Sequence, residues 1–152
     1  MIRLVLLALV AACTVHRVDG GRDEAWETRR LAEAADAYWQ AVRWRTFEDA
    51  ARYVEEGEAR LEFLRLWSVD APRQVVEAVV VHVSVGDPLP PDRAPQLREG
   101  TVLVRVEGYG PQSPVVAVDL VEQAWWLGPD GWTLAPTETG RTVLRTGSDP
   151  AR

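Results

Sequence analysis

Two side chains of the sequence could carry acid–base chemistry, namely Asp119 and His82. Asp119 interrupts the apolar segment VVAVDLV, and a carboxylate enclosed in an apolar cavity can serve as a general base. The alternative is that Asp119 faces solvent or a partner subunit. His82 lies in the valine-rich segment VVVHVSV, where a ring nitrogen could accept a proton near neutral pH. Its alternative is a hydrogen-bonded structural role, so the sequence leaves both assignments open.

Tyr38 is a third polar candidate, because a predicted helix could bring its phenol to either of these groups. The alternative for Tyr38 is a place in the apolar stripe of that helix, beside Trp39. Metal chemistry has little support, since the only other histidine is His16 and the only thiol is that of Cys13. We therefore expect neither a metal nor a cofactor.

Cys13 ends an apolar run over residues 4–12. This run is too short to span a bilayer, which takes about 20 apolar residues, but it has the order of a secretory signal. The motif VAAC at residues 10–13 resembles the lipobox of bacterial lipoproteins. The resemblance implies removal of residues 1–12, acylation of the Cys13 thiol and permanent membrane anchoring. The alternative is a buried first strand or helix with Cys13 in the core.

The lipobox resemblance also implies a place in the bacterial cell envelope, which we expect to be the periplasmic face of the outer membrane. The formal net charge of the chain is −6, and its arginines form no basic stripe. Nucleic-acid binding depends on neutralising phosphates, so we expect no nucleic-acid partner. Anionic lipid would not attract such a chain either, so the lipid on Cys13 would have to provide the membrane attachment.

The first half of the sequence predicts a tether and three helices. Residues 13–24 are polar and without periodicity, which is typical of a flexible tether. From residue 25 the apolar side chains recur with helical spacing, which predicts a long amphipathic helix. A second helix is expected over residues 46–54, opened by a capping box at Thr46. A third, shorter helix is expected over residues 58–67.

After residue 72 the apolar pattern changes to the alternation of β-strands. Four strands are expected, over residues 74–85, 101–110, 113–127 and 132–136. The proline-rich segment 86–100 is predicted to be a loop outside the sheet, and residues 137–152 a polar tail. Helices followed by a meandering antiparallel sheet predict one α+β domain over residues 25–136.

A family resemblance supports this fold. The segments AYWQAVRWRTFEDAARYV and QAWWLGPDGWTLAP resemble the first helix and last hairpin of the nuclear-transport-factor-2-like superfamily. The resemblance implies a curved sheet that wraps the first helix into a cone with an apolar pocket. It also implies that homodimers are common. The residues expected to line the pocket are Tyr38, Trp39, Val42, Val104 and Val118.

The sequence supports two functional hypotheses. The first is a membrane-anchored, non-enzymatic accessory or binding module that takes a protein partner or a small apolar ligand. The second is a small-molecule isomerase, dehydratase or hydrolase that uses Asp119 with His82, as the superfamily resemblance allows. Geometry separates them, because the enzyme requires both side chains within reach of each other in one cavity.

Overall fold

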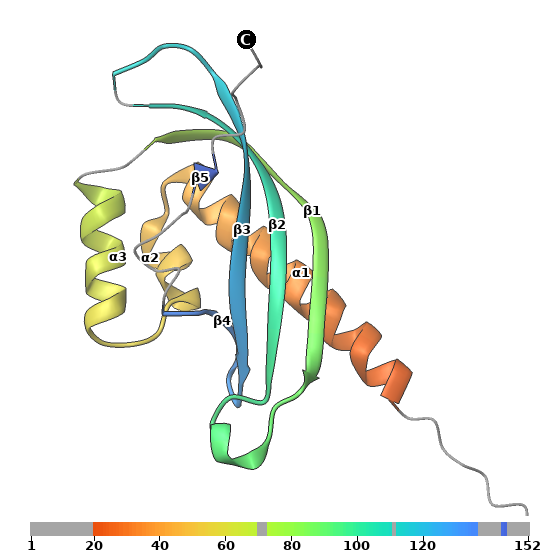
Figure 1. Ribbon diagram of the computed structural model, residues 1–152. Helices are drawn as coiled ribbons and strands as arrows, with labels where there is room; N and C mark the ends of the chain where they lie inside the picture. Colours follow the sequence, from red (N-terminus) through yellow and green to blue (C-terminus); the bar gives the residue numbers. More distant parts are fainter. Residues whose placement is uncertain (1–19, 70–72, 111, 137–143, 146–152) are drawn as a thin grey trace, which may run out of the picture.

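The structure, a computed structural model, describes residues 20–69, 73–110, 112–136 and 144–145 (Figure 1). It is α+β, with helices followed by an antiparallel sheet, as the sequence predicts. The helical elements are α1 (Gly20–Trp44), α2 (Phe47–Ala50), the 3-10 turn η1 (Ala51–Tyr53) and α3 (Glu58–Ser68). The strands are β1 (Gln74–Pro88), β2 (Arg98–Tyr109), β3 (Ala117–Gly128), β4 (Gly131–Leu134) and β5 (Leu144–Arg145), with a second 3-10 turn, η2 (Pro91–Arg93), between β1 and β2.

Helix α1 is longer than expected, since it begins at Gly20 and takes in residues 20–24 that we assigned to the tether. An ion pair of 2.8 Å between Glu27 and Arg98 joins the early turns of α1 to the start of β2. Both side chains are largely buried, so this contact can stabilise a helical start that the polar sequence does not predict. The apolar stripe of α1 is buried as predicted, through Leu31, Ala35, Tyr38, Trp39 and Val42.

The predicted capping box at Thr46 is wrong. Thr46 makes no side-chain cap to α2, and its hydroxyl instead approaches the carbonyl oxygen of Ala41 at 3.4 Å. The amide of Thr46 also donates to that carbonyl, at 2.9 Å. The chain uses Thr46 to end α1 because only two residues separate α1 from α2. Helix α2 is a single turn, continued by η1.

The sheet has the order β1-β2-β3-β4, and the two-residue β5 pairs with β3 beside β4. Strands β1 and β2 extend into segment 86–100, which we expected to lie outside the sheet. Their ladder continues to Pro88 opposite Arg98, and the amide of Leu89 donates to the carbonyl oxygen of Leu97 at 2.8 Å. Only the short turn around η2 lies outside the sheet. Pro90 and Pro91, which cannot donate a backbone hydrogen bond, stand in this turn.

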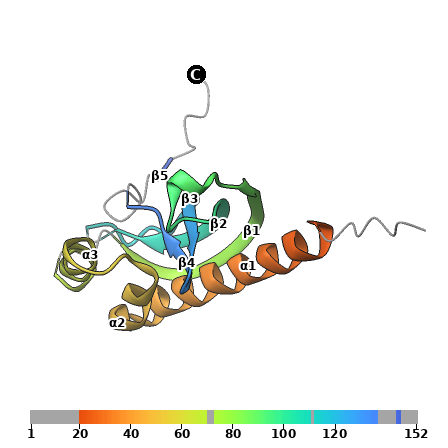
Figure 2. The same cartoon turned by 90° about the horizontal axis from the view of Figure 1, so that it is seen from below.

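The sheet curves strongly around α1 (Figure 2). Register shifts in β1, between Val75 and Glu77 and between Val80 and His82, mark two irregularities of the kind that bend a strand. The concave face presents a row of fully buried valines against the helix: Val102, Val104, Val106 and Val121. This curvature gives the sheet one enclosed face and one outer face.

The alternation along β3 decides which side chains are enclosed. Asp119, Val121, Gln123 and Trp125 are buried on the concave face, whereas Leu120 and its outward-facing neighbours are exposed. The valine-rich pattern could not choose between these faces, because apolar residues occupy both. Asp119 therefore points into the domain and not toward solvent.

Aromatic side chains fill the centre of the enclosed face. Tyr38 makes edge-to-face contacts with Trp39 and Trp125, at centroid separations of 5.4 and 6.0 Å. The indole Nε1 of Trp39 donates to Oε1 of Gln123 at 3.0 Å, which gives a buried polar group in β3 a partner on α1. The middle of the domain is thus packed, and open space lies toward its ends.

Gly108→Ala is expected to lower the free energy of unfolding by about 1–3 kcal/mol. A Cβ at Gly108 would lie 2.4 Å from the carbonyl oxygen of Gln74, and this backbone atom cannot rotate away. Gly110→Ala is the matched control, since a Cβ at Gly110 meets nothing within 4 Å. Urea unfolding of both variants measures the effect, and equal losses would contradict the close approach of β1 to β2.

Candidate functional site

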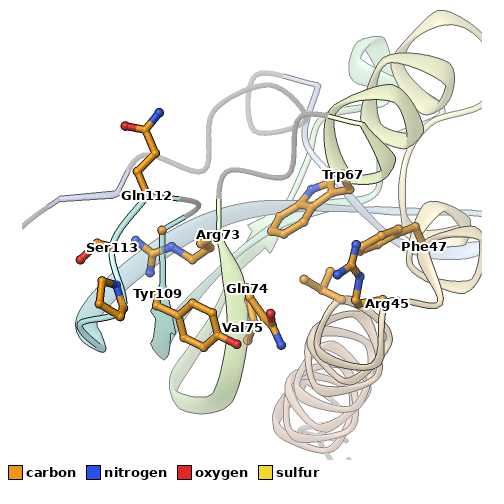
Figure 3. Close-up of a pocket in the computed structure, with 12 residues that line it drawn as sticks. Arg45, Phe47, Trp67, Arg73, Gln74, Val75, Tyr109, Gln112 and Ser113 are labelled. Carbon is orange, nitrogen blue, oxygen red and sulfur yellow. The ribbon is translucent and has the colours of Figure 1, made fainter.

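A pocket of about 530 Å³ opens at one end of the sheet, between the helices and the strand ends (Figure 3). It lies beside the C-terminal end of α1, the start of β1 and the end of β2. One wall is apolar, formed by Val42, Phe47, Trp67 and Val75. The remaining lining residues carry most of the polar groups: Arg45, Arg73, Gln74, Tyr109, Gly110, Gln112, Ser113 and Pro114. The pocket thus combines an apolar wall with a few polar groups, as small-molecule sites commonly do.

Arg73 is held at the pocket by Asp119. An Nη2 atom of Arg73 lies 2.6 Å from Oδ2 of Asp119, and the two side chains are 12% and 2% exposed. The contact crosses the sheet, since Arg73 directly precedes β1 and Asp119 lies in β3, where it pairs with Val106 of β2. Gly108 is buried on the same face of β2 as Val106, and a Cβ there would meet the backbone of Gln74 and Val75 at the start of β1.

The guanidinium of Arg73 is only partly satisfied by this ion pair. Its Nε and Nη1 atoms are buried and find no acceptor among the residues that the structure describes. Oδ2 of Asp119 is close enough for an ion pair, but its alignment with Arg73 is too poor to count as a hydrogen bond. A buried charge with unused donors is costly, so Asp119 is the carboxylate on which the burial of Arg73 depends.

Arg45 supplies a second cation from the end of α1. Its amide donates to the carbonyl oxygen of Val42 while that of Thr46 reaches Ala41, which is the Schellman pattern of helix termination. Glycine usually occupies this position because it requires a positive φ, and Arg45 has a φ of 60°. The guanidinium lies 5.9 Å from the ring centroid of Phe47 and makes no ion pair within the described part of the chain.

Arg45→Gly is expected to raise the free energy of unfolding by about 1 kcal/mol, because glycine adopts the left-handed conformation without strain. Arg43→Gly, two residues earlier and inside α1, is expected to lower it by about 1 kcal/mol. Thermal or urea unfolding of the two variants would show opposite signs. A loss of stability in both would mean that the side chain of Arg45 stabilises the fold.

The structure does not bring His82 and Asp119 together. Asp119 is buried on the concave face, whereas His82 is exposed on β1 and pairs in register with Leu103. Tyr38 lies in the aromatic core, and burial raises its pKa above the ordinary value for tyrosine, so its phenol stays protonated. None of the three forms a shared acid–base arrangement with another.

Of the five residues predicted to line a pocket, only Val42 does so. Tyr38, Trp39 and Val104 are buried in the core, because aromatic packing fills the centre of the domain. Val118 is 54% exposed on the outer face of β3, so its predicted place in the pocket is wrong. The strand alternation that buries Asp119 turns Val118 outward.

The sequence analysis missed every other lining residue, including the three on which the argument most depends, Arg45, Trp67 and Arg73. Arg73 directly precedes the long valine-rich strand, and a charged residue there is the signal that could have drawn attention to it. Trp67 ends the apolar side of α3, but nothing local shows that this side faces a pocket. Arg45 looks like any exposed arginine until its backbone conformation is known.

A second hollow of about 920 Å³ lies between α1, the η1–α3 segment and the β3–β4 hairpin. Trp126 and Trp132 contribute to it, with a rim of charged side chains. Several of these charges already have partners, as when Arg60 contacts Glu56 and the carbonyl oxygen of Val54. The rim of the larger hollow carries charges of both signs, whereas the charged side chains that line the smaller pocket, among the described residues, are the cations Arg45 and Arg73.

Cys13, the predicted lipid attachment point, lies outside the described residues. Within the described ranges, no helix is long and apolar enough to cross a membrane. Among the same residues, no group of three or more His, Cys, Asp or Glu side chains is placed to hold a metal ion.

Comparisons with known proteins add no relative. No protein-family model matches the chain, and neither the curated proteins nor the solved structures contain a match. The functional assignment therefore depends on the geometry of the pocket.

Proposed function

We propose that this protein is a lipid-anchored binding module of the bacterial envelope that takes a small apolar or amphipathic ligand. The observation that carries the proposal is the pocket of about 530 Å³, with Phe47, Trp67 and Val75 on its apolar side. Pockets of roughly 300–1,000 Å³ with apolar walls and few polar groups are the usual form of small-ligand sites. The four apolar wall residues are themselves buried, so most of the apolar surface removed from water on binding would be that of the ligand.

The nuclear-transport-factor-2-like cone is part of this proposal. Its support is the long first helix, two shorter helical segments and a curved antiparallel sheet around α1 (Figure 2). The aromatic packing of Trp39 and Trp125 closes the middle of such a cone. The ligand site would then be restricted to the open end, beside Val42 and Arg73.

The proposed anchor precedes α1 in the sequence, whereas the pocket residues Val42 and Arg45 stand at the C-terminal end of that helix. A helix of 25 residues is about 37 Å long, which is a length that would separate the pocket from the first turn of the helix.

The enzyme alternative has no comparable support. It requires a base and a partner in one cavity, whereas Asp119 contacts Arg73 inside the domain and His82 is exposed on the sheet. The pairing with Arg73 also gives Asp119 a structural role that needs no substrate. We therefore propose one function, that of binding.

The test of binding uses the full-length chain carrying Cys13→Ser and isothermal titration with 1-octanol, a neutral probe. We expect binding at micromolar to submillimolar concentration with a negative heat-capacity change, because apolar surface is buried. Gln74→Trp places an indole at an exposed position of the pocket lining and should weaken binding at least fivefold. Ser84→Trp, at an exposed position farther along β1, is the matched control and should not change it.

Equal weakening by both tryptophan variants, or no binding of 1-octanol, would contradict a ligand site in this pocket. The anchor has an independent test. Cells given a palmitate analogue should label the unaltered protein and not its Cys13→Ser variant. Equal labelling of the two would refute lipid attachment at Cys13 without bearing on the pocket.

A further inference from the structure

We infer that the pocket recognises an organic acid, through a carboxylate head group attached to an apolar body. This inference deepens the proposed function, because it names the chemical class of ligand that the same pocket would take. It rests on three features: the charges that line the pocket, the polar side chains beside them, and the strained backbone at Arg45.

The charges favour a monoanion. Arg45 and Arg73 line the pocket, and no acidic side chain is among the described residues that line it. Asp119, beneath the wall, offsets the charge of Arg73 through their ion pair. Two guanidinium charges and one carboxylate leave a single net positive charge, which one carboxylate neutralises and a phosphate dianion exceeds.

The donors favour a head group that accepts hydrogen bonds. Arg45 lines the pocket and has no ion pair within the described structure, whereas Nε and Nη1 of Arg73 lack an acceptor but are buried, so Arg73 contributes its charge more than its free donors. Gln74, Gln112 and Ser113 add polar groups to the lining. Guanidinium groups bind carboxylates more strongly than they bind neutral groups, because both the charge and the hydrogen bonds contribute. An alcohol would offer an acceptor without the charge, and an ammonium group would offer neither.

The arrangement places a cation next to an apolar wall. In Figure 3, Arg45 lies beside Phe47, while Trp67 faces the pocket from α3 and Arg73 lies toward the strand side. A ligand with one charged end and an apolar body can contact both kinds of surface. Its apolar part would lie against Phe47, Trp67 and Val75, and its carboxylate would lie toward the guanidinium groups.

The backbone at Arg45 supports a role for its side chain. A left-handed φ of 60° is unfavourable for arginine, and glycine would end α1 in the same way without strain. Strained residues of this kind cluster at binding sites, where the side chain justifies the conformation. The formal net charge of the chain is −6, so its surface as a whole would repel an organic acid. Binding of a carboxylate would therefore depend on local cations such as Arg45 and Arg73.

The experiment compares three probes with the same eight-carbon tail: octanoate, 1-octanol and octylammonium. Isothermal titration uses the full-length chain carrying Cys13→Ser at low ionic strength. Octanoate should bind at least tenfold more tightly than 1-octanol, and octylammonium more weakly than 1-octanol. Octyl phosphate, added as a fourth probe at a pH where it is a dianion, should bind more weakly than octanoate.

Two variants locate the selectivity. Arg45→Gln should reduce octanoate affinity three- to tenfold and reduce 1-octanol affinity by a clearly smaller factor, so that the ratio of the two affinities falls. Arg43→Gln makes the same charge change two residues away, at a position that does not line the pocket, and should alter neither affinity. Arg73→Lys keeps a cation for Asp119 but removes the guanidinium donors, so it should also weaken octanoate selectively.

The outcomes separate this inference from the proposed function. If 1-octanol binds and octanoate binds no more tightly, the carboxylate inference is overturned while the apolar pocket stands. Equal effects of Arg45→Gln and Arg43→Gln would also overturn it, because the preference would then come from overall charge. If octyl phosphate binds most tightly, the head group is a phosphate and not a carboxylate. If no probe binds, both proposals fail.

Discussion

We expect Asp119→Leu to lower the free energy of unfolding by about 3–5 kcal/mol, because it leaves the buried guanidinium of Arg73 without a counter-charge. The two side chains are only 12% and 2% exposed, so water can replace the lost carboxylate only in part. Urea unfolding followed by tryptophan fluorescence would measure the loss as a shift of the midpoint at constant slope.

The double variant Arg73→Met with Asp119→Leu is the control. Removing both charges takes away the ion pair and the desolvation cost together, so most of the stability should return. A catalytic or exposed Asp119 would behave differently. Asp119→Leu would then cost under about 1 kcal/mol, and the double variant would be no more stable than the single one.

Trp39→Ala is expected to cost about 3–5 kcal/mol, since the indole is 2% exposed and packs in the aromatic core. The variant would also leave Oε1 of Gln123 without its donor. Trp44→Ala, on the same helix, is the matched control because Trp44 is 68% exposed, and it should cost under about 1 kcal/mol. The same unfolding measurement applies to both.

A loss under about 1 kcal/mol for Trp39→Ala would place this side chain outside the core. Similar losses for Trp39→Ala and Trp44→Ala would have the same meaning, since the two residues differ chiefly in burial. Either result would remove the reason for placing the ligand site at the open end, because the middle of the domain would not be packed as described.

The sequence predicts the order of helices and strands well, because hydrophobic periodicity reports it directly. The stripe of α1 and the alternation along β2 are of this kind. Element ends are less predictable, since they depend on contacts made later in the chain. The Glu27–Arg98 ion pair joins the early turns of α1 to β2, and Thr46 bonds to the end of α1 instead of capping α2.

The site is harder to predict than the fold. Both faces of β3 carry apolar residues, so alternation alone could not show that Asp119 is buried and Val118 exposed. The contact between Arg73 and Asp119 joins residues far apart in sequence across β2, and it depends on the sheet register. The sequence contains both residues, but only the folded sheet makes them neighbours.

Intermolecular nuclear Overhauser effects between 1-octanol and the full-length chain with Cys13→Ser test the central claim most directly. The account predicts contacts from the alkyl chain to the indole of Trp67 and the methyl groups of Val75, which line the pocket. Contacts confined to Trp126 in the second hollow, or to Val118 on the outer face, would contradict a ligand site at the open end of the sheet.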